Sequence, residues 1–210
     1  MVFVFDLDDT VCETDKYSTY YIQDFFDRNS NQYPYKKVKD IDRFAEGKFS
    51  WKLPAALAWY KRYGDEMMLN FPCKANAIEL IDALHTLGHK VVLATARTTD
   101  WHTNPEEITK KWIEKQGLQF DKIYFGRADK EKICEDEKAN VFLDDDLDIT
   151  AKVAQHFSGK KNMHVFLMTS KFNESRPTPK GVTRVQDFDD FAKKILKIQN
   201  NKKTETNKAK

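Results

Sequence analysis

Short apolar segments alternate with helix-forming segments along most of the chain. The first, Val2–Phe5, consists of β-branched and aromatic residues, a pattern typical of a strand that is buried on both faces. Similar segments follow at residues 90–96, 122–125, 140–143 and 163–168. Because strands that alternate with helices form parallel sheets, this pattern predicts an α/β fold with short loops between each strand and the next helix.

The segments between these strands have helical spacing of apolar residues and recognisable ends. Gly88 stops the first pattern, as glycine often does after a helix. Asn104 and Pro105 form a start signal, with asparagine as the cap and proline in the first turn, and Gly117 ends that helix. The predicted helices are residues 74–87, 105–116, 129–136 and 149–157.

Residues 13–72 interrupt the alternation with three helical patterns, at residues 16–28, 36–46 and 54–63, and no convincing strand. This segment is rich in aromatic residues. We therefore expect a core of residues 1–12 and 73–198, with a helical segment of residues 13–72 inserted after the first strand. Residues 199–210 are rich in Lys, Asn and Thr without periodicity, which predicts a disordered tail.

Composition narrows the class of protein. Hydrophobic residues make up 40% of the 210 residues, enough for a packed core, and the net charge of +2 does not suggest a surface that binds nucleic-acid polymers. Cys12, Cys73 and Cys134 lack metal-site spacing and indicate reduced thiols. With no apolar run near membrane-spanning length and no secretory leader, a soluble cytoplasmic protein is expected.

Acidic residues follow two of the predicted strands. Asp6 and Asp8 come at the end of the first strand, where alternation lets both project in similar directions, and Asp144, Asp145 and Asp146 follow the fourth. Two carboxylates about 4 Å apart repel by roughly 4 kcal/mol at an effective dielectric constant of about 20, so a cation or a proton must relieve them. An all-oxygen set suits Mg²⁺. Helix capping is the alternative, but it accounts for one aspartate in each loop and not for three.

Two further residues fit the same edge of the sheet. Thr95 closes an apolar strand and brings a hydroxyl and backbone N–H groups, including that of Ala96, which can hold phosphate oxygens. Lys130 opens a helix and could offset the carboxylates, although an ordinary surface lysine is its plain alternative. Arg97 could pair with a structural acid or touch the substrate, and the sequence leaves both open.

In order, the segments FDLDDT, VVLAT, a helix-opening lysine and VFLDD resemble the haloacid dehalogenase (HAD) superfamily. This resemblance implies a phosphatase in which Asp6 attacks phosphorus and Asp8 protonates the leaving group and then activates water. It also implies that Thr95 and Lys130 bind the phosphoryl group. An aspartate can serve as acid and base if burial in the cleft raises its pKa, which is what we expect for Asp8.

The resemblance also implies a Mg²⁺ site. The ligands would be the Asp6 carboxylate, the backbone carbonyl of Asp8 and the Asp145 carboxylate. Asp144 would contact the ligands and not the ion itself, and Asp146 and Asp148 could hold metal-bound waters.

The resemblance implies a Rossmann-like core on which the inserted residues 13–72 form a small helical cap. The position of this insert and several later segments are similar to the 5′(3′)-deoxyribonucleotidase branch. The implied substrate is a small phosphorylated metabolite, with a (deoxy)nucleoside monophosphate expected. Phe44, Phe49 and Trp51 could stack on a base, although aromatic residues on helices more often belong to a core.

Other classes fit the sequence less well. A phosphoacceptor signalling domain carries its paired acids on the first strand and a lone aspartate later, whereas here the acidic run comes late. A DxD glycosyltransferase would not need Thr95 or Lys130. A HAD phosphatase for another small metabolite, or a non-catalytic HAD-fold binding module, remains as the alternative to a nucleotidase.

Overall fold

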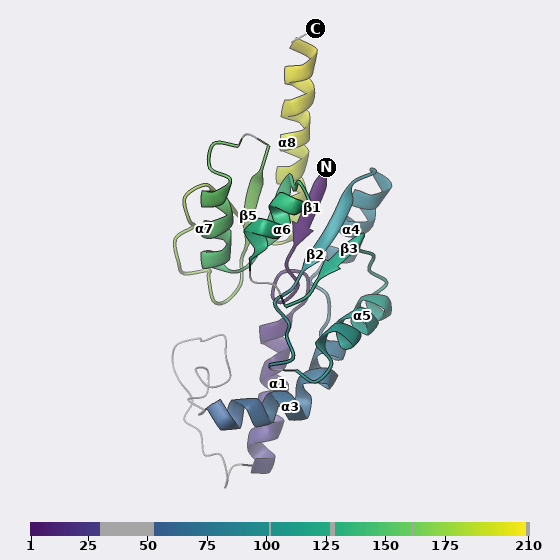
Figure 1. Cartoon of the computed structure of the whole chain (residues 1–210), viewed down its shortest axis with the longest axis vertical. Helices are drawn as coiled ribbons and strands as arrows, with labels where there is room; N and C mark the ends of the chain where they lie inside the picture. Colours follow the sequence, from purple (N-terminus) through teal and green to yellow (C-terminus); the bar gives the residue numbers. More distant parts are fainter. Residues whose placement is uncertain (30–52, 101, 127–128, 161, 209–210) are drawn as a thin grey trace.

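Among the described residues, six parallel strands form one sheet at the centre of the molecule (Figure 1). The computed structural model describes residues 1–29, 53–100, 102–126, 129–160 and 162–208. The predicted parallel α/β sheet is confirmed. In sheet order the strands are β3 (Lys122–Tyr124), β2 (Lys90–Ala94), β1 (Val2–Phe5), β4 (Val141–Asp144), β5 (His164–Met168) and β6 (Val182–Val185).

The side chains of each strand alternate between two buried faces. Phe3 and Phe5 point into one apolar core, and Val4 between them points into the other. The register carries this alternation across the sheet, since Phe3 pairs with Val91 and Val4 pairs with Val92. Both faces of the central strands are therefore buried from solvent, which explains their nearly continuous apolar sequences.

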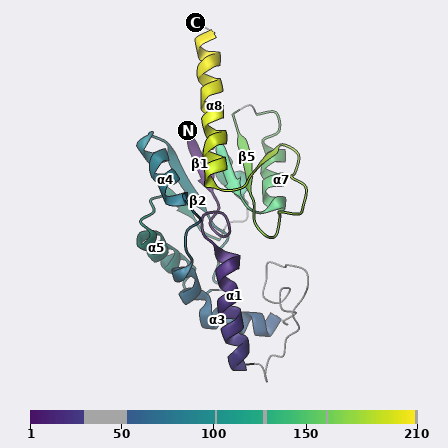
Figure 2. The ribbon, with the colours of Figure 1, turned by 180° about the vertical axis from the view of Figure 1, so that it is seen from behind.

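Helices cover both faces of the sheet (Figures 1 and 2). Besides residues of the inserted segment, the core around Phe3 and Phe5 includes buried residues of three helices, and the core around Val4 includes buried residues of two others. The first three are α4 (Ala77–Thr86), α5 (Pro105–Gln116) and α8 (Phe188–Lys208), and the other two are α6 (Lys130–Asp136) and α7 (Leu147–His156).

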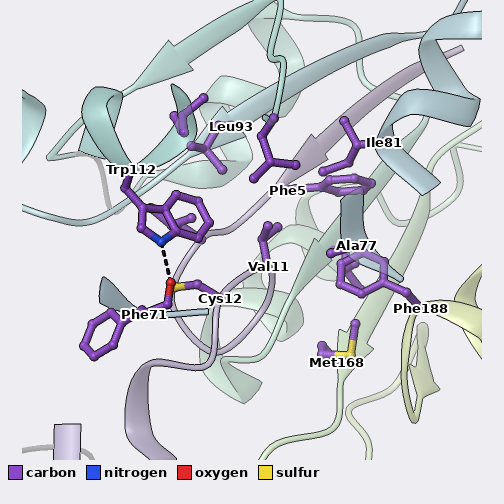
Figure 3. Close-up of a cluster of buried hydrophobic side chains, with 14 of the residues drawn as sticks. Phe5, Val11, Cys12, Phe71, Ala77, Ile81, Leu93, Trp112, Met168 and Phe188 are labelled. Carbon is purple, nitrogen blue, oxygen red and sulfur yellow. Dashed lines mark hydrogen bonds between the residues drawn. The ribbon is translucent and has the colours of Figure 1, made fainter. Parts of the chain in front are cut away.

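Two helices from the inserted segment lie beyond the carboxyl ends of the strands (Figure 1). They are α1 (Thr14–Asn29) and α3 (Leu53–Asn70), which pack against each other, while α3 also packs against α5. Phe71 follows the last residue of α3, and the indole of Trp112 donates a hydrogen bond of 2.6 Å to its backbone carbonyl (Figure 3). The predicted helix at residues 36–46 lies outside the described residues.

Several predicted boundaries shift in the structure. The second strand ends at Ala94, so Thr95 lies in the loop that follows it. Helix α5 has the predicted bounds, but the Asn104 side chain makes no capping hydrogen bond. Helix α3 continues past Gly64 to Asn70, because a glycine within a helix costs only about 1 kcal/mol and packing can offset it.

The C-terminal part of the chain differs most from the prediction. Strand β6 and helix α8 were not predicted, and α8 runs to Lys208 through most of the segment that the sequence predicts to be disordered. No glycine or proline interrupts residues 188–208, so nothing local stops the helix. Its far end projects from the body of the molecule (Figure 1). None of the described helices, α8 included, is long and apolar enough to cross a membrane.

Candidate active site

Four charged residues predicted from the sequence meet at the carboxyl edge of the sheet. Asp6 follows β1, Asp144 ends β4, Asp145 comes next, and Lys130 is the first residue of α6. The Lys130 ammonium group donates hydrogen bonds to Asp6 Oδ1 and, at 2.8 Å, to Asp144 Oδ2. All four side chains are buried. Lys130 is therefore not an ordinary surface lysine, and its ammonium group bridges two of the carboxylates.

The donor set fits a divalent cation. Asp6, Asp144 and Asp145 each offer a carboxylate oxygen, and these atoms lie within 4.8 Å of one another. One ammonium group cannot balance three ionised carboxylates, so the cluster has room for two further positive charges. Burial, together with the neighbouring acids Asp144 and Asp8, raises the pKa of Asp6 to about 7 despite Lys130. A hard cation with oxygen ligands would remove this penalty, as expected for Mg²⁺.

Asp144 and Asp146 are already engaged by the protein. Asp144 Oδ2 accepts from Lys130, and its Oδ1 accepts from the backbone N–H of Asp146 at 2.8 Å. Asp146 caps α7, with Oδ1 accepting from the N–H groups of Asp148 and Ile149 at 2.8 and 3.0 Å. Capping, the alternative weighed for the whole acidic run, thus accounts for one of its members. These bonds favour Asp145 over Asp144 as a metal ligand.

Asp8 has surroundings different from those expected. Arg97 donates hydrogen bonds to both of its carboxylate oxygens, from Nε to Oδ2 at 2.9 Å and from Nη2 to Oδ1 at 2.7 Å. Thr14 also donates to Oδ1, at 2.7 Å. Burial on its own would raise the pKa of Asp8, but the charge and hydrogen bonds of Arg97 outweigh it and lower the pKa to about 2. The expectation of a raised pKa is wrong for this arrangement, because Arg97 is the structural partner of Asp8.

Thr95 is fully buried at the end of β2. Its hydroxyl oxygen accepts a hydrogen bond of 3.3 Å from the backbone N–H of Arg97. The residues of this loop that line the adjoining cavity are Ala96, Arg97, Thr98 and His102. The role of Thr95 and Ala96 in holding phosphate oxygens remains a prediction.

A cavity of about 370 Å³ opens above the charged cluster. Its floor is acidic and holds Lys130, and its wall includes side chains from α3 and from the loop after β2. The floor and wall include Asp6, Asp8, Asp145, Lys130, Trp59, Tyr60, Met67, Met68, Phe71 and His102. The predicted stacking residues Phe44, Phe49 and Trp51 lie outside the described residues.

Sequence reasoning assigned no role to two residues that shape this site. Asn173 is buried, and its side-chain amide donates to the backbone carbonyls of Asp145 and Met168 at 2.8 and 2.7 Å. It therefore ties the loop of Asp145 to the end of β5. His102 meets the ring of Tyr60 edge to face at 5.6 Å, and burial lowers its pKa to about 4. The sequence does hold one signal for Asn173: it is a polar residue that comes shortly after a strand, as Thr95 does.

Solved structures share this arrangement of sheet and helices. A haloacid dehalogenase-like hydrolase from Streptococcus pneumoniae is similar with a TM-score of 0.58, over 91% of this chain and 97% of that one, at 13% identity. The chain has the haloacid dehalogenase fold. CbbY from Rhodobacter sphaeroides, in complex with xylulose 1,5-bisphosphate, has the same fold with a TM-score of 0.59, over 89% of this chain and 94% of its own, at 12% identity.

A further solved structure and a relative found by sequence are also similar to this chain. The D,D-heptose 1,7-bisphosphate phosphatase of B. bronchiseptica, complexed with magnesium and phosphate, gives a TM-score of 0.55 over 93% of this chain and 98% of its own, at 13% identity. A Halalkalibacterium halodurans protein, provisionally named as a nucleotidase, is 29% identical over 116 residues, which is 55% of each chain. This chain thus matches about half the length of that relative. No protein-family model matches the sequence.

Proposed function

We propose that this protein is a Mg²⁺-dependent phosphomonoester hydrolase that works through an aspartyl-phosphate on Asp6. The observation that carries the proposal is the cluster of Asp6, Lys130 and Asp145 on the floor of a cavity at the carboxyl edge of the sheet. A carboxylate nucleophile divides displacement at phosphorus into two easier steps. Most of what phosphoryl transfer then requires is positioning and neutralisation of charge.

The residues divide this chemistry among them. Asp6 attacks phosphorus, and Lys130, which already contacts its carboxylate, orients it and neutralises charge on the phosphoryl oxygens. Asp8 is the proposed acid and base. Because Arg97 lowers its pKa to about 2, Asp8 starts ionised, the form that takes a proton from the attacking water, and its step as an acid requires the charge of the bound phosphoryl group to raise that pKa. The Asp6 and Asp145 carboxylates and the Asp8 carbonyl would hold the ion. Bound Mg²⁺ would supply further positive charge and orient the phosphoryl group.

The finer proposal is that the substrate is a (deoxy)nucleoside monophosphate. The similarity to a relative named as a nucleotidase supports it, as does a cavity of a size suited to a small metabolite, with aromatic residues above its charged floor. Among the described residues, Tyr60 is the aromatic side chain best placed to stack on a base, since it is partly exposed and lines the cavity. We also propose that residues 13–72 act as the cap that selects the substrate.

The general proposal is tested with a chromogenic phosphate ester. Hydrolysis of p-nitrophenyl phosphate should require Mg²⁺ and stop with a chelator. Asp6→Asn should lower kcat by at least about 1,000-fold, because it removes the attacking charge and keeps the shape. Near wild-type activity in this variant would reject Asp6 as nucleophile. No turnover of any ester by the wild type would instead favour a binding module.

The substrate proposal is tested with a panel of phosphomonoesters. Nucleoside monophosphates, deoxy and pyrimidine types above all, should exceed sugar phosphates and phosphoserine in kcat/KM by about tenfold or more, since stacking contributes about 1–3 kcal/mol per base. Tyr60→Ala should reduce this preference, and Phe44, Phe49 and Trp51 should be truncated next. Equal or lower values for nucleotides would leave the phosphatase standing and reject the nucleotidase.

A further inference from the structure

One histidine lines the cavity on the side of α3. His102 lies in the loop between β2 and α5, where its backbone N–H donates to the carbonyl of Thr98 at 3.3 Å. Its ring meets that of Tyr60, which α3 carries into the same cavity. The phosphoryl group of a substrate would lie against Asp6 and Lys130, at the carboxyl edge of the sheet. Its organic group would then extend towards α3 and meet these two rings.

The close approach of His102 to α3 defines which edge of its ring faces the helix. A Cβ atom at Gly64 would lie 2.9 Å from Nδ1 of His102, too close for van der Waals contact, and 3.8 and 3.9 Å from Cε1 and Cγ. Nδ1 is therefore the ring atom nearest the helix. Because Nε2 lies on the opposite edge of an imidazole, it points away from α3 and is the polar atom that the ring can offer to a ligand.

Neither ring nitrogen of His102 is used by the described part of the protein. Nδ1 is buried without a hydrogen-bond partner there, and no described residue bonds to Nε2. Burial, together with the charge of Arg97, lowers the pKa of His102 to about 4, so the ring is neutral near pH 7 and carries one N–H hydrogen. On Nδ1 this hydrogen would be buried against α3 with no acceptor, and we therefore place it on Nε2.

We propose that His102 is a specificity-determining residue, which donates a hydrogen bond from Nε2 to a carbonyl oxygen of a pyrimidine base. This inference rests on the proposed phosphatase function and refines its substrate class. Gly64 belongs to the same arrangement, because a larger residue would displace the ring from α3. A site built to hydrogen-bond one group of a substrate disfavours an analogue that lacks this group, since the donor is then left unpaired.

The test compares two esters that share one sugar phosphate. Deoxyuridine 5′-monophosphate carries a base with carbonyl oxygens, and 2-deoxyribose 5-phosphate has no base. His102→Phe keeps a flat ring and removes the donor. It should lower kcat/KM about tenfold for the nucleotide and less than about threefold for the sugar phosphate. His102→Gln places an amide N–H near the position of Nε2, so it should keep the nucleotide within about threefold of wild type.

Gly64→Ala moves the ring without changing His102 itself. Alanine favours a helix more than glycine does, so this variant of α3 should unfold at the wild-type temperature or above it. Its Cβ should displace the ring and produce the same selective loss for the nucleotide.

His156→Phe is the matched control. His156 also meets an aromatic ring, that of Phe157, but it lies in the last turn of α7, away from the cavity that the start of α7 lines. This variant should leave both esters unchanged. Thermal unfolding of each variant monitors the fold.

Binding of deoxyuridine, the product without its phosphate, needs no turnover and is measured by calorimetry. His102→Phe should weaken it about tenfold and His102→Gln less than about threefold. Equal losses for the two esters would overturn the inference, as would equal effects of His102→Phe and His102→Gln or unchanged deoxyuridine binding in His102→Phe. If wild-type protein hydrolyses neither ester with Mg²⁺ while the binding result holds, the proposed phosphatase function fails and His102 stands as a base-binding residue.

Discussion

Three consecutive carboxylates at the end of β4 show how much the surroundings of neighbouring residues can differ. Asp144 has both oxygens hydrogen-bonded, one to Lys130 and one to a backbone N–H group. Asp146 accepts two backbone N–H groups as the cap of α7. Asp145 is buried between them, with its backbone carbonyl held by Asn173. Three aspartates in a row thus have three different roles: Asp144 is the partner of Lys130, Asp145 is the proposed metal ligand and Asp146 is the cap of α7.

This difference predicts distinct effects for two alanine variants. Asp145→Ala should raise the Mg²⁺ concentration that gives half-maximal activity by at least about tenfold, and should weaken the rise in Tm that Mg²⁺ produces by binding the folded state. Asp146→Ala should change the Mg²⁺ requirement little but lower the free energy of unfolding by about 1 kcal/mol, through loss of the cap. Similar Mg²⁺ responses in the two variants would contradict the choice of Asp145.

At the scale of elements, Glu137 links α6 to the edge of the sheet. It follows the last residue of α6 and accepts hydrogen bonds from Lys90 on β2 at 2.6 Å, and from Lys122 and Tyr124 on β3 at 2.8 and 2.6 Å. Burial alone would raise its pKa, but these three donors and the lysine charge lower it from 4.5 to about 2. One carboxylate therefore joins a helix end to two neighbouring strands.

The lowered pKa predicts a pH-dependent contribution to stability. Because the folded state favours ionised Glu137, its contribution is complete above about pH 4.5 and is lost as the pH falls towards 2. Glu137→Gln should lower the free energy of unfolding near neutral pH by about 1–2 kcal/mol, a modest value since its lysine partners are about half exposed. The difference from wild type should shrink as the pH falls from 5 to about 2.

Urea unfolding at a series of pH values measures this difference. Glu106→Gln is the matched control, because Glu106 makes an exposed i, i+4 pair with Lys110 on α5. Pairs of this kind contribute about 0–1 kcal/mol, so the control should shift stability little at any pH. A pH-independent loss in Glu137→Gln would mean that its shape and not its charge holds the elements together.

At the scale of the whole molecule, the site forms where the sheet meets the inserted helices. The two chain segments that connect them pair with each other, with the N–H of Glu13 donating to Pro72 at 3.0 Å and that of Lys74 donating to Val11 at 2.8 Å. These crossings lie next to Asp8 and Thr14. The inserted helices are therefore joined to the core through the same short segments that lie beside the proposed acid.

The sequence by itself determined the parallel sheet and the acidic edge. Alternating apolar strands and helices, and carboxylates at the ends of β1 and β4, depend on local patterns and on the direction of the chain, both of which a sequence records. Asp6, Lys130 and Asp145 come together because parallel strands end at one edge. The helical boundaries of α5 follow in the same way from a proline and a glycine.

Only the tertiary structure decided the partners of these side chains. Arg97 and Asp8 are 89 residues apart in the sequence, and their pairing depends on where the loop after β2 lies relative to α5. The same holds for Asn173 beneath Asp145 and for β6, which pairs with β5 through contacts that no local pattern encodes. Local propensity places a residue at an edge. Packing between distant segments determines which neighbour it meets there, and so its charge and its role.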